Sequence, residues 1–85
     1  MRLDKYLKVT RILKRRSVGK ELALNQRILI NGRTAKPAAE VKVDDIIEVI
    51  FGNRHLKVHV LKVQQYSKKE DAEMLYEVME EFCEE

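Results

Sequence analysis

The side chains best suited to chemistry in this chain are the arginines and lysines that crowd its first twenty positions. A planar guanidinium donates two parallel hydrogen bonds to one phosphate group, whereas a lysine ammonium acts as a mobile point charge. The cations concerned are Arg2, Lys5, Lys8, Arg11, Lys14, Arg15, Arg16 and Lys20. Such a cluster is typical of a surface that binds the phosphate backbone of a nucleic acid.

The charge of the chain is divided between its two halves. The net charge is only +3 at pH 7, yet residues 1–43 hold 12 Lys and Arg against 3 Asp and Glu, a net charge of +9. Residues 44–85 hold 5 Lys and Arg against 11 Asp and Glu, a net charge of −6. This asymmetry predicts a polyanion-binding half joined to an acidic segment.

The other side chains with catalytic or metal-binding potential lack suitable partners in the sequence. Asp4 has no second acid or base beside it, so an ion pair with a neighbouring cation is a better interpretation than catalysis. His55 and His59 would lie about 13 Å apart in a strand that rises roughly 3.3 Å per residue, too far to share a metal ion. Cys83 stands in an acidic stretch, which does not favour a thiolate nucleophile. We therefore expect no enzymatic activity, no cofactor and no metal, and we leave Tyr6 open between core packing and stacking on a base.

The length and composition predict one domain inside the cell. A chain of 85 residues leaves no room for a second core. The first residues lack the apolar stretch of a signal peptide, and no apolar run is long enough to span a membrane. The single cysteine cannot form an internal disulfide, so a cytoplasmic location is expected.

Two short helices are expected to position the cations. Apolar residues recur at helical spacing over residues 2–8, which leaves the lysines of that segment outward. Residues 9–16 are expected to form a turn or a broken helix. Ser17 is a suitable N-cap for a second helix over residues 18–25. Two helices joined so tightly would bring the cations together, and the start of the second would add free N–H groups suited to a phosphate.

The middle of the chain predicts a small antiparallel sheet. Residues 28–30 form a β-branched apolar run, and Asn31-Gly32 after it is a strong hairpin signal because both residues tolerate positive φ. Residues 45–51 predict a longer strand that turns at Gly52-Asn53. Residues 56–60 alternate apolar and polar side chains and predict the returning strand.

The C-terminal segment predicts a final helix over residues 68–83. Ala72, Leu75, Met79 and Phe82 follow one another at helical spacing, and the remaining side chains are mostly acidic. We expect the apolar stripe to pack on the sheet. A helix that repels RNA from one side, or that binds a basic partner, is the alternative interpretation.

Together these residues resemble the S-four-type RNA-binding domain, an α+β fold in which two short helices pack on a small bent antiparallel sheet. The resemblance covers about residues 1–50 and would make residues 1–67 the domain, with the acidic helix of residues 68–85 as part of the same compact unit. Two departures affect the sheet: Gln26 stands where the family often has glycine, and Asp44-Asp45 replaces a Gly-Asp pair. The matching motifs are Arg2-Leu3-Asp4-Lys5-Tyr6-Leu7, Arg11, Arg15-Arg16-Ser17, Ile28-x-Ile30-Asn31-Gly32, Lys36-Pro37, Val41 and Asp45-x-Ile47-x-Val49.

The resemblance implies which side chains face RNA. They are Arg2, Lys5, Arg11, Arg15, Arg16, Ser17 and Lys20, with Asn31, Arg33 and Lys36 along the rim. Lys8 and Lys14 join them because they belong to the same basic cluster.

The stand-alone length makes the chain similar to the RqcP-like proteins and related ribosome-associated heat-shock S-four proteins. That family implies binding to ribosomal RNA and to tRNA or peptidyl-tRNA on large subunits that carry a stalled nascent chain, and help with alanine tailing of that chain. A nascent-chain tailing factor is then a candidate partner, no membrane is involved, and a monomer is expected. A general ribosome-associated heat-shock role, a DNA-binding regulator and a protein–protein adaptor are the alternatives, whereas an RNA-modifying enzyme would need a longer chain.

Overall fold

The computed structural model describes residues 1–13, 15–65, 68 and 70–83, and for Arg16 it describes the backbone alone. The helices are α1 (Leu3–Val9), α2 (Arg16–Leu24) and the short 3-10 helix η1 (Ala72–Met74). The strands are β1 (Ile28–Ile30), β2 (Arg33–Thr34), β3 (Ile46–Phe51), β4 (Arg54–Val60) and β5 (Tyr76–Cys83).

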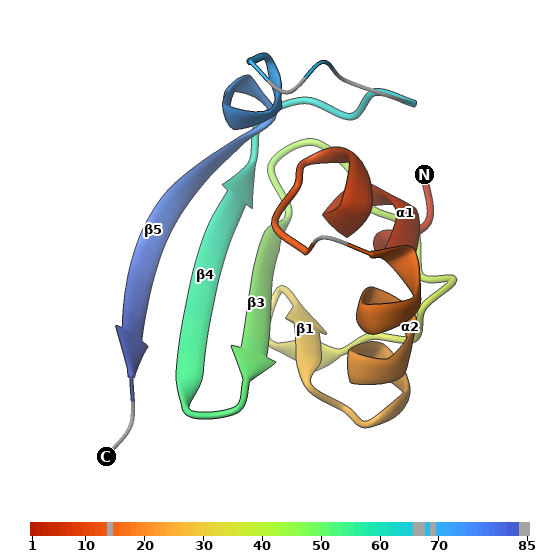
Figure 1. Cartoon of the computed structure of the whole chain (residues 1–85), viewed down its shortest axis with the longest axis vertical. Helices are drawn as coiled ribbons and strands as arrows, with labels where there is room; N and C mark the ends of the chain where they lie inside the picture. The colour runs from red at the N-terminus through yellow and green to blue at the C-terminus, as the bar shows by residue number, and fades with distance from the viewer. Residues whose placement is uncertain (14, 66–67, 69, 84–85) are drawn as a thin grey trace.

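The strands form one antiparallel sheet in the order β2-β1-β3-β4-β5, and α1 and α2 cover one of its faces (Figure 1). The core lies between these two layers, where Leu3, Tyr6 and Leu7 of α1 meet Ile47 and Val58 of the sheet. All five of these side chains are fully buried. The α+β architecture that the sequence predicted is therefore confirmed.

Helix α1 begins against the loop that precedes β3. The Leu3 N–H donates to the Ala39 carbonyl at 2.8 Å, and the Asp4 N–H donates to the Pro37 carbonyl at 3.2 Å. The first N–H groups of a helix have no partner within the helix, so this loop satisfies two of them. The contact fixes α1 on the sheet, together with the bond that the Tyr6 hydroxyl donates to the Leu75 carbonyl at 2.9 Å.

Helix α2 begins earlier than expected, so the prediction that Ser17 is its N-cap is wrong. Arg15 holds the cap position in an extended conformation, with φ −132° and ψ 138°, and no side chain caps the helix. The Arg15 carbonyl accepts hydrogen bonds from the N–H groups of Val18 and Gly19, at 3.1 and 3.5 Å. Because helical geometry already begins at Arg16, the Ser17 hydroxyl lies within the first turn and is exposed.

A residue with positive φ follows each of the two helices. Gln26 has φ 60°, its N–H donates to the Ala23 carbonyl at 3.1 Å, and the Arg27 N–H donates to the Leu22 carbonyl at 2.9 Å. This pair of bonds is the Schellman motif, in which glycine usually holds the left-handed position. Arg11 also has φ 60° and follows α1, where its N–H donates to the Lys8 carbonyl at 3.0 Å.

The hairpin predicted at Asn31-Gly32 is confirmed, with φ 53° and 83° at these residues. The Asn31 side chain also ties the hairpin to β3, because its Oδ1 accepts from the Ile46 N–H at 2.9 Å and its Nδ2 donates to Asp45 at 3.1 Å. The family's Gly-Asp position, Asp44 in this chain, adopts φ 74°. Gln26 and Asp44 thus adopt the left-handed conformation at positions where the family often has glycine.

The C-terminal segment forms a strand, so the helix predicted over residues 68–83 is wrong. Strand β5 pairs with the outer edge of β4, with one register shift. The spacing that suggested a helix is only half fulfilled, because Ala72 and Leu75 are buried whereas Met79 and Phe82 are exposed. Without β5, the edge of β4 would present a row of unpaired N–H and C=O groups. Backbone pairing with that edge therefore outweighs the local preference for a helix.

Candidate nucleic-acid interface

The cations of α1 lie on the side of the helix that faces away from the core. Arg2, Lys5 and Lys8 are three residues apart and so share one side of the helix. The Arg2 guanidinium donates to both carboxylate oxygens of Asp4, at 3.2 and 3.1 Å. Asp4 is 2% exposed and also accepts the Lys5 N–H at 2.8 Å. The expected ion-pair role of Asp4 is thus confirmed, and the pair fixes the direction of Arg2.

Lys5 and Lys8 differ in how freely they reach solvent. The Lys5 ammonium donates to the Gln65 side chain in the segment after β4, and Lys5 is half-buried. Lys8 is exposed and forms no ion pair with any residue that the structure describes. Lys8 is therefore the α1 cation with its charge fully available to an anion.

The connection between the helices presents two more cations. Arg11 and Arg15 are exposed, while Leu13 between them is buried and its N–H donates to the Leu7 carbonyl at 3.1 Å. Lys14, predicted to belong to the same cluster, lies outside the described residues. Because Leu13 is anchored in the core, the connection stays close to the helices, and the side chains of Arg11 and Arg15 remain in solvent.

Helix α2 crosses α1 at a glycine, and this contact sets the direction of its cations. A Cβ atom on Gly19 would lie 3.5 Å from a methyl group of Leu7, so Gly19 faces α1. Val18 lines a groove against the sheet. Successive residues of a helix are rotated by about 100° about its axis. Lys20, the residue after Gly19, therefore points away from α1 and is exposed. Arg16 lies one turn before Lys20, and its side chain is outside the described residues.

The first turn of α2 suits an anion. It contains no acidic residue of its own, and no side chain caps the helix. The positive end of a helix dipole together with its free N–H groups is a ready anion-binding site. We call the exposed side chains of α1, α2 and their connection the basic surface, and its described members are Arg2, Lys8, Arg11, Arg15 and Lys20.

The three rim residues have different roles in the fold. Arg33 and Lys36 are exposed and line one shallow hollow beside β2. Lys36 precedes Pro37, whose carbonyl accepts the Asp4 N–H, so Lys36 lies beside the start of α1. Asn31 is exposed, but both ends of its amide are occupied by the turn. Its first role is therefore structural.

Three acidic residues of the C-terminal segment lie at the edge of the sheet that is far from α2. Glu77, Glu80 and Glu81 are exposed on β5, which is the strand farthest from α2 (Figure 1). Glu81 forms an ion pair with Arg54 of β4, and the hydrogen bond within this pair raises the pKa of the Arg54 guanidinium. The charge asymmetry of the sequence is thus an asymmetry in space, with anions along one edge of the sheet and cations on the helices.

The remaining candidates have structural surroundings. Tyr6 is fully buried, and burial raises the pKa of its phenol, so this side chain belongs to the core and does not stack on a base. His55 stacks on Phe82 with ring centroids 4.6 Å apart. His59 contacts Asp44 at 3.0 Å. Among the described residues, no group of three potential ligands is placed to hold a metal ion, and no helix has the length and apolar character needed to cross a membrane.

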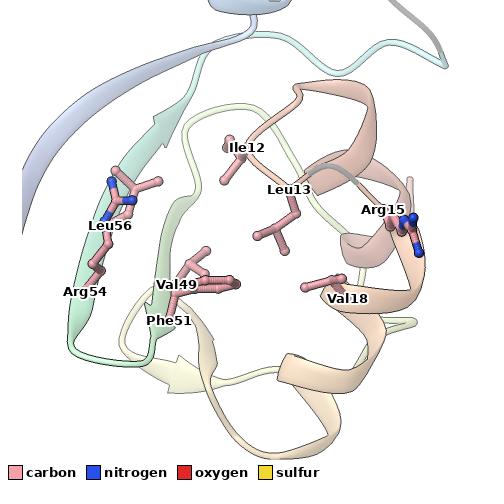
Figure 2. A pocket seen from close by; sticks show the side chains of 8 residues that line it. All are labelled: Ile12, Leu13, Arg15, Val18, Val49, Phe51, Arg54 and Leu56. Carbon is pink, nitrogen blue, oxygen red and sulfur yellow. The ribbon is translucent and has the colours of Figure 1, made fainter.

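One feature of the surface has no counterpart in the pattern of the sequence. A groove with a volume of about 580 Å³ separates the helical layer from β3 and β4, with Arg15 on the helical side and Arg54 on the sheet (Figure 2). The pattern of the sequence identified β3 and β4 but carried no signal that Phe51, at the end of β3, stays 48% exposed. The apolar walls are formed by Ile12, Leu13, Val18, Val49, Phe51 and Leu56.

Comparison with known proteins places the chain among its relatives. The family model described as S4 domain matches residues 1–47. The RQC P-site tRNA stabilizing factor of Streptococcus pneumoniae is 53% identical to the chain, over 95% of the chain and 92% of that protein. The factor of the same name from Bacillus subtilis is 44% identical, over 95% of the chain and 94% of that protein.

A solved structure agrees with this relationship. The trimeric structure of Vibrio cholerae Heat Shock Protein 15 matches with a TM-score of 0.86 and 26% identity, over 93% of this chain and 81% of that one. The fold, the helix-borne cations and the sequence identities all agree with the resemblance drawn from the motifs. The chain therefore belongs to the S4 domain family and, within it, to the RQC P-site tRNA stabilizing factors.

Proposed function

We propose that this protein is an RNA-binding factor of ribosome quality control. It binds ribosomal RNA and tRNA on large ribosomal subunits that carry a stalled nascent chain, and it assists alanine tailing of that chain by holding the tRNA, without catalysing a reaction. The observation that carries the proposal is the basic surface on two helices packed against each other, with the acidic strand β5 at the far edge of the sheet.

Binding is proposed to depend on phosphate contacts and on shape. Structured RNA presents its phosphates and 2′-hydroxyls more readily than its deep major groove. Arg11 and Arg15 suit bidentate contacts with phosphate, and Lys8 and Lys20 supply mobile charges. The uncapped start of α2 adds backbone donors for a further phosphate.

The separation of charge supports one orientation on the ribosome. An RNA surface attracts the basic surface and repels the carboxylates of β5, so the protein approaches with its helices first. The protein is proposed to contact two RNAs. The names of the relatives indicate P-site tRNA as the first, and ribosomal RNA of the large subunit is the second. A compact domain with cations at two helices and along the rim at Arg33 and Lys36 suits such a bridge between two RNA backbones.

The proposal is tested with purified large ribosomal subunits, either empty or carrying peptidyl-tRNA. Lys8→Ala combined with Lys20→Ala removes two cations that form no ion pair with any described residue. Lys57→Ala is the matched control, because Lys57 lies between Leu56 and Val58, which face the helical layer, and so points to the other face of the sheet. Affinity is measured over a range of salt concentrations.

Wild-type protein is expected to prefer subunits that carry peptidyl-tRNA. The double variant is expected to bind more weakly and to lower the steepness of the log–log salt dependence by roughly 1 for each lost phosphate contact, whereas the control keeps the wild-type slope. Equal affinity for empty and occupied subunits would exclude the tRNA contact. Equal competition by duplex DNA of the same charge would favour the DNA-binding alternative instead.

A further inference from the structure

The groove between α2 and the sheet has the chemistry of a site for a flat apolar group beside an anion. Its walls are apolar, and its charged lining residues, within the described part of the chain, are two arginines. Phe51 is 48% exposed there, so its ring has apolar surface that the protein itself does not cover. Figure 2 shows Val49 and Phe51 on the sheet side facing Leu13 and Val18 on the helical side.

The two arginines are not equivalent. Arg54 is paired with Glu81 of β5, which neutralises much of its charge. Arg15 forms no ion pair with any residue described in the structure. It also belongs to the basic surface, because it is the N-cap residue of α2. Arg15 lies at the helical rim of the groove with its guanidinium turned outward (Figure 2), so the groove meets the basic surface at this rim.

These features select a nucleotide as the occupant. A nucleobase has an apolar face that stacks on aromatic rings, and the phosphate joined to it is an anion. The volume of about 580 Å³ lies in the range of roughly 300–1,000 Å³ that is usual for small-ligand sites. An apolar peptide would also cover Phe51, but it would bring no anion to Arg15.

We propose that the groove receives one unpaired base of the bound RNA, which stacks on the Phe51 ring while its phosphate contacts Arg15. This inference rests on the proposed function and adds a second kind of recognition to it. The basic surface contacts the backbone of paired RNA without regard to sequence, whereas the groove requires a base that has left its helix. The protein then distinguishes an RNA with an exposed base from a continuous duplex of equal charge.

The test compares two RNA probes with the same number of phosphates, a hairpin with an unpaired loop and a fully paired duplex. Phe51→Leu keeps the groove apolar but removes the ring, and Phe51→Tyr keeps the ring. Phe82→Leu is the matched control, because Phe82 is also a half-exposed aromatic residue but stacks on His55 on the other face of the sheet.

Wild-type protein and Phe51→Tyr are expected to prefer the hairpin. Phe51→Leu is expected to lose roughly 5- to 100-fold in hairpin affinity, the range for one base–aromatic stack, and to keep its affinity for the duplex. The control variant keeps both affinities. Hairpin affinity that is unchanged in Phe51→Leu overturns the proposal, including the case in which the groove binds an apolar peptide.

A second measurement does not depend on the folding of any variant. A 5-iodouridine in the loop is irradiated in the complex with wild-type protein, and the crosslinked residue is identified by mass spectrometry. A crosslink at Phe51 supports the groove, and crosslinks confined to other residues overturn it. The proposed function fails separately, namely if Lys8→Ala with Lys20→Ala leaves the duplex affinity unchanged.

Discussion

Replacing Arg11 by glycine separates the charge of this residue from its backbone conformation. Arg11 follows α1 with φ 60°, a left-handed conformation that costs an ordinary L-residue roughly 1–2 kcal/mol. Glycine adopts this conformation freely but loses more entropy on folding, which costs about 0.5–1 kcal/mol. The difference predicts that Arg11→Gly raises the free energy of unfolding by about 0.5–1 kcal/mol.

The same substitution removes a cation from the basic surface. We expect the affinity for RNA to fall by about 1.5–3 kcal/mol, the worth of a hydrogen bond to a charged group, which is roughly ten- to hundred-fold. Gln26→Gly is the matched control, because Gln26 follows α2 with the same φ of 60° and carries no charge. Both variants should gain stability, and only Arg11→Gly should lose affinity.

Urea denaturation followed by circular dichroism measures stability, and filter binding to the hairpin RNA measures affinity. A loss of stability in Arg11→Gly alone would show that the Arg11 side chain supports the fold, contrary to its exposure. Unchanged RNA affinity in the same variant would place Arg11 outside the interface. The combined result expected here, higher stability with weaker binding, is the pattern of a strained residue retained at a functional site.

Three further substitutions test how α1 is held in place. Gly19→Ala is expected to raise the free energy of unfolding by about 0.5–1 kcal/mol, because alanine favours a helix more than glycine does. The added Cβ would lie 3.5 to 3.7 Å from its neighbours, which is an ordinary contact distance. A lower melting temperature would show that the helices pack too closely for a methyl group. Tyr6→Phe is expected to cost about 0.5–1.5 kcal/mol at neutral pH through the lost bond to the Leu75 carbonyl. Burial raises the pKa of the Tyr6 phenol, so its neutral form contributes stability that is complete below pH of about 10 and is lost as the pH rises through the folded-state pKa. Alkaline titration of the unfolding free energy should therefore be shallower in Tyr6→Phe than in wild type, and equal slopes would refute this assignment. Asp4→Ala is expected to cost about 1–3 kcal/mol in urea denaturation and to weaken RNA binding by releasing Arg2, whereas unchanged values for both would exclude the ion pair as a positioning device.

Most of the fold was predictable because local chemistry and tertiary structure agree along residues 1–60. Apolar spacing identified α1, and the Asn31-Gly32 turn identified the hairpin because these residues tolerate positive φ. The exact start of α2 was not predictable from Ser17, since an N-cap preference is weaker than the geometry that Leu13 imposes on the connection. The sequence marked Gln26 as a departure from the family's glycine, and the structure shows that Gln26 itself holds the left-handed position of the Schellman motif.

The C-terminal segment shows where local pattern fails. Ala72, Leu75, Met79 and Phe82 satisfy a helical stripe, and glutamate and methionine are good helix formers. The competing signal is the free edge of β4, which exists only after the sheet has formed and is therefore absent from any short window of sequence. A register shift between Lys57 and Val58 further breaks the simple alternation in β5 that could have indicated a strand.

Correcting the helix to a strand changes the role of the acidic residues. On a helix, the carboxylates would form one solvated face with no fixed relation to the cations. On β5 they line the exposed edge of the sheet, where charge discourages pairing with another chain. There Glu81 also neutralises Arg54, which leaves Arg15 as the groove cation without an ion pair among the described residues. In the proposed complex, the carboxylates of β5 repel the RNA backbone, so β5 favours an approach of the RNA from the side of the helices.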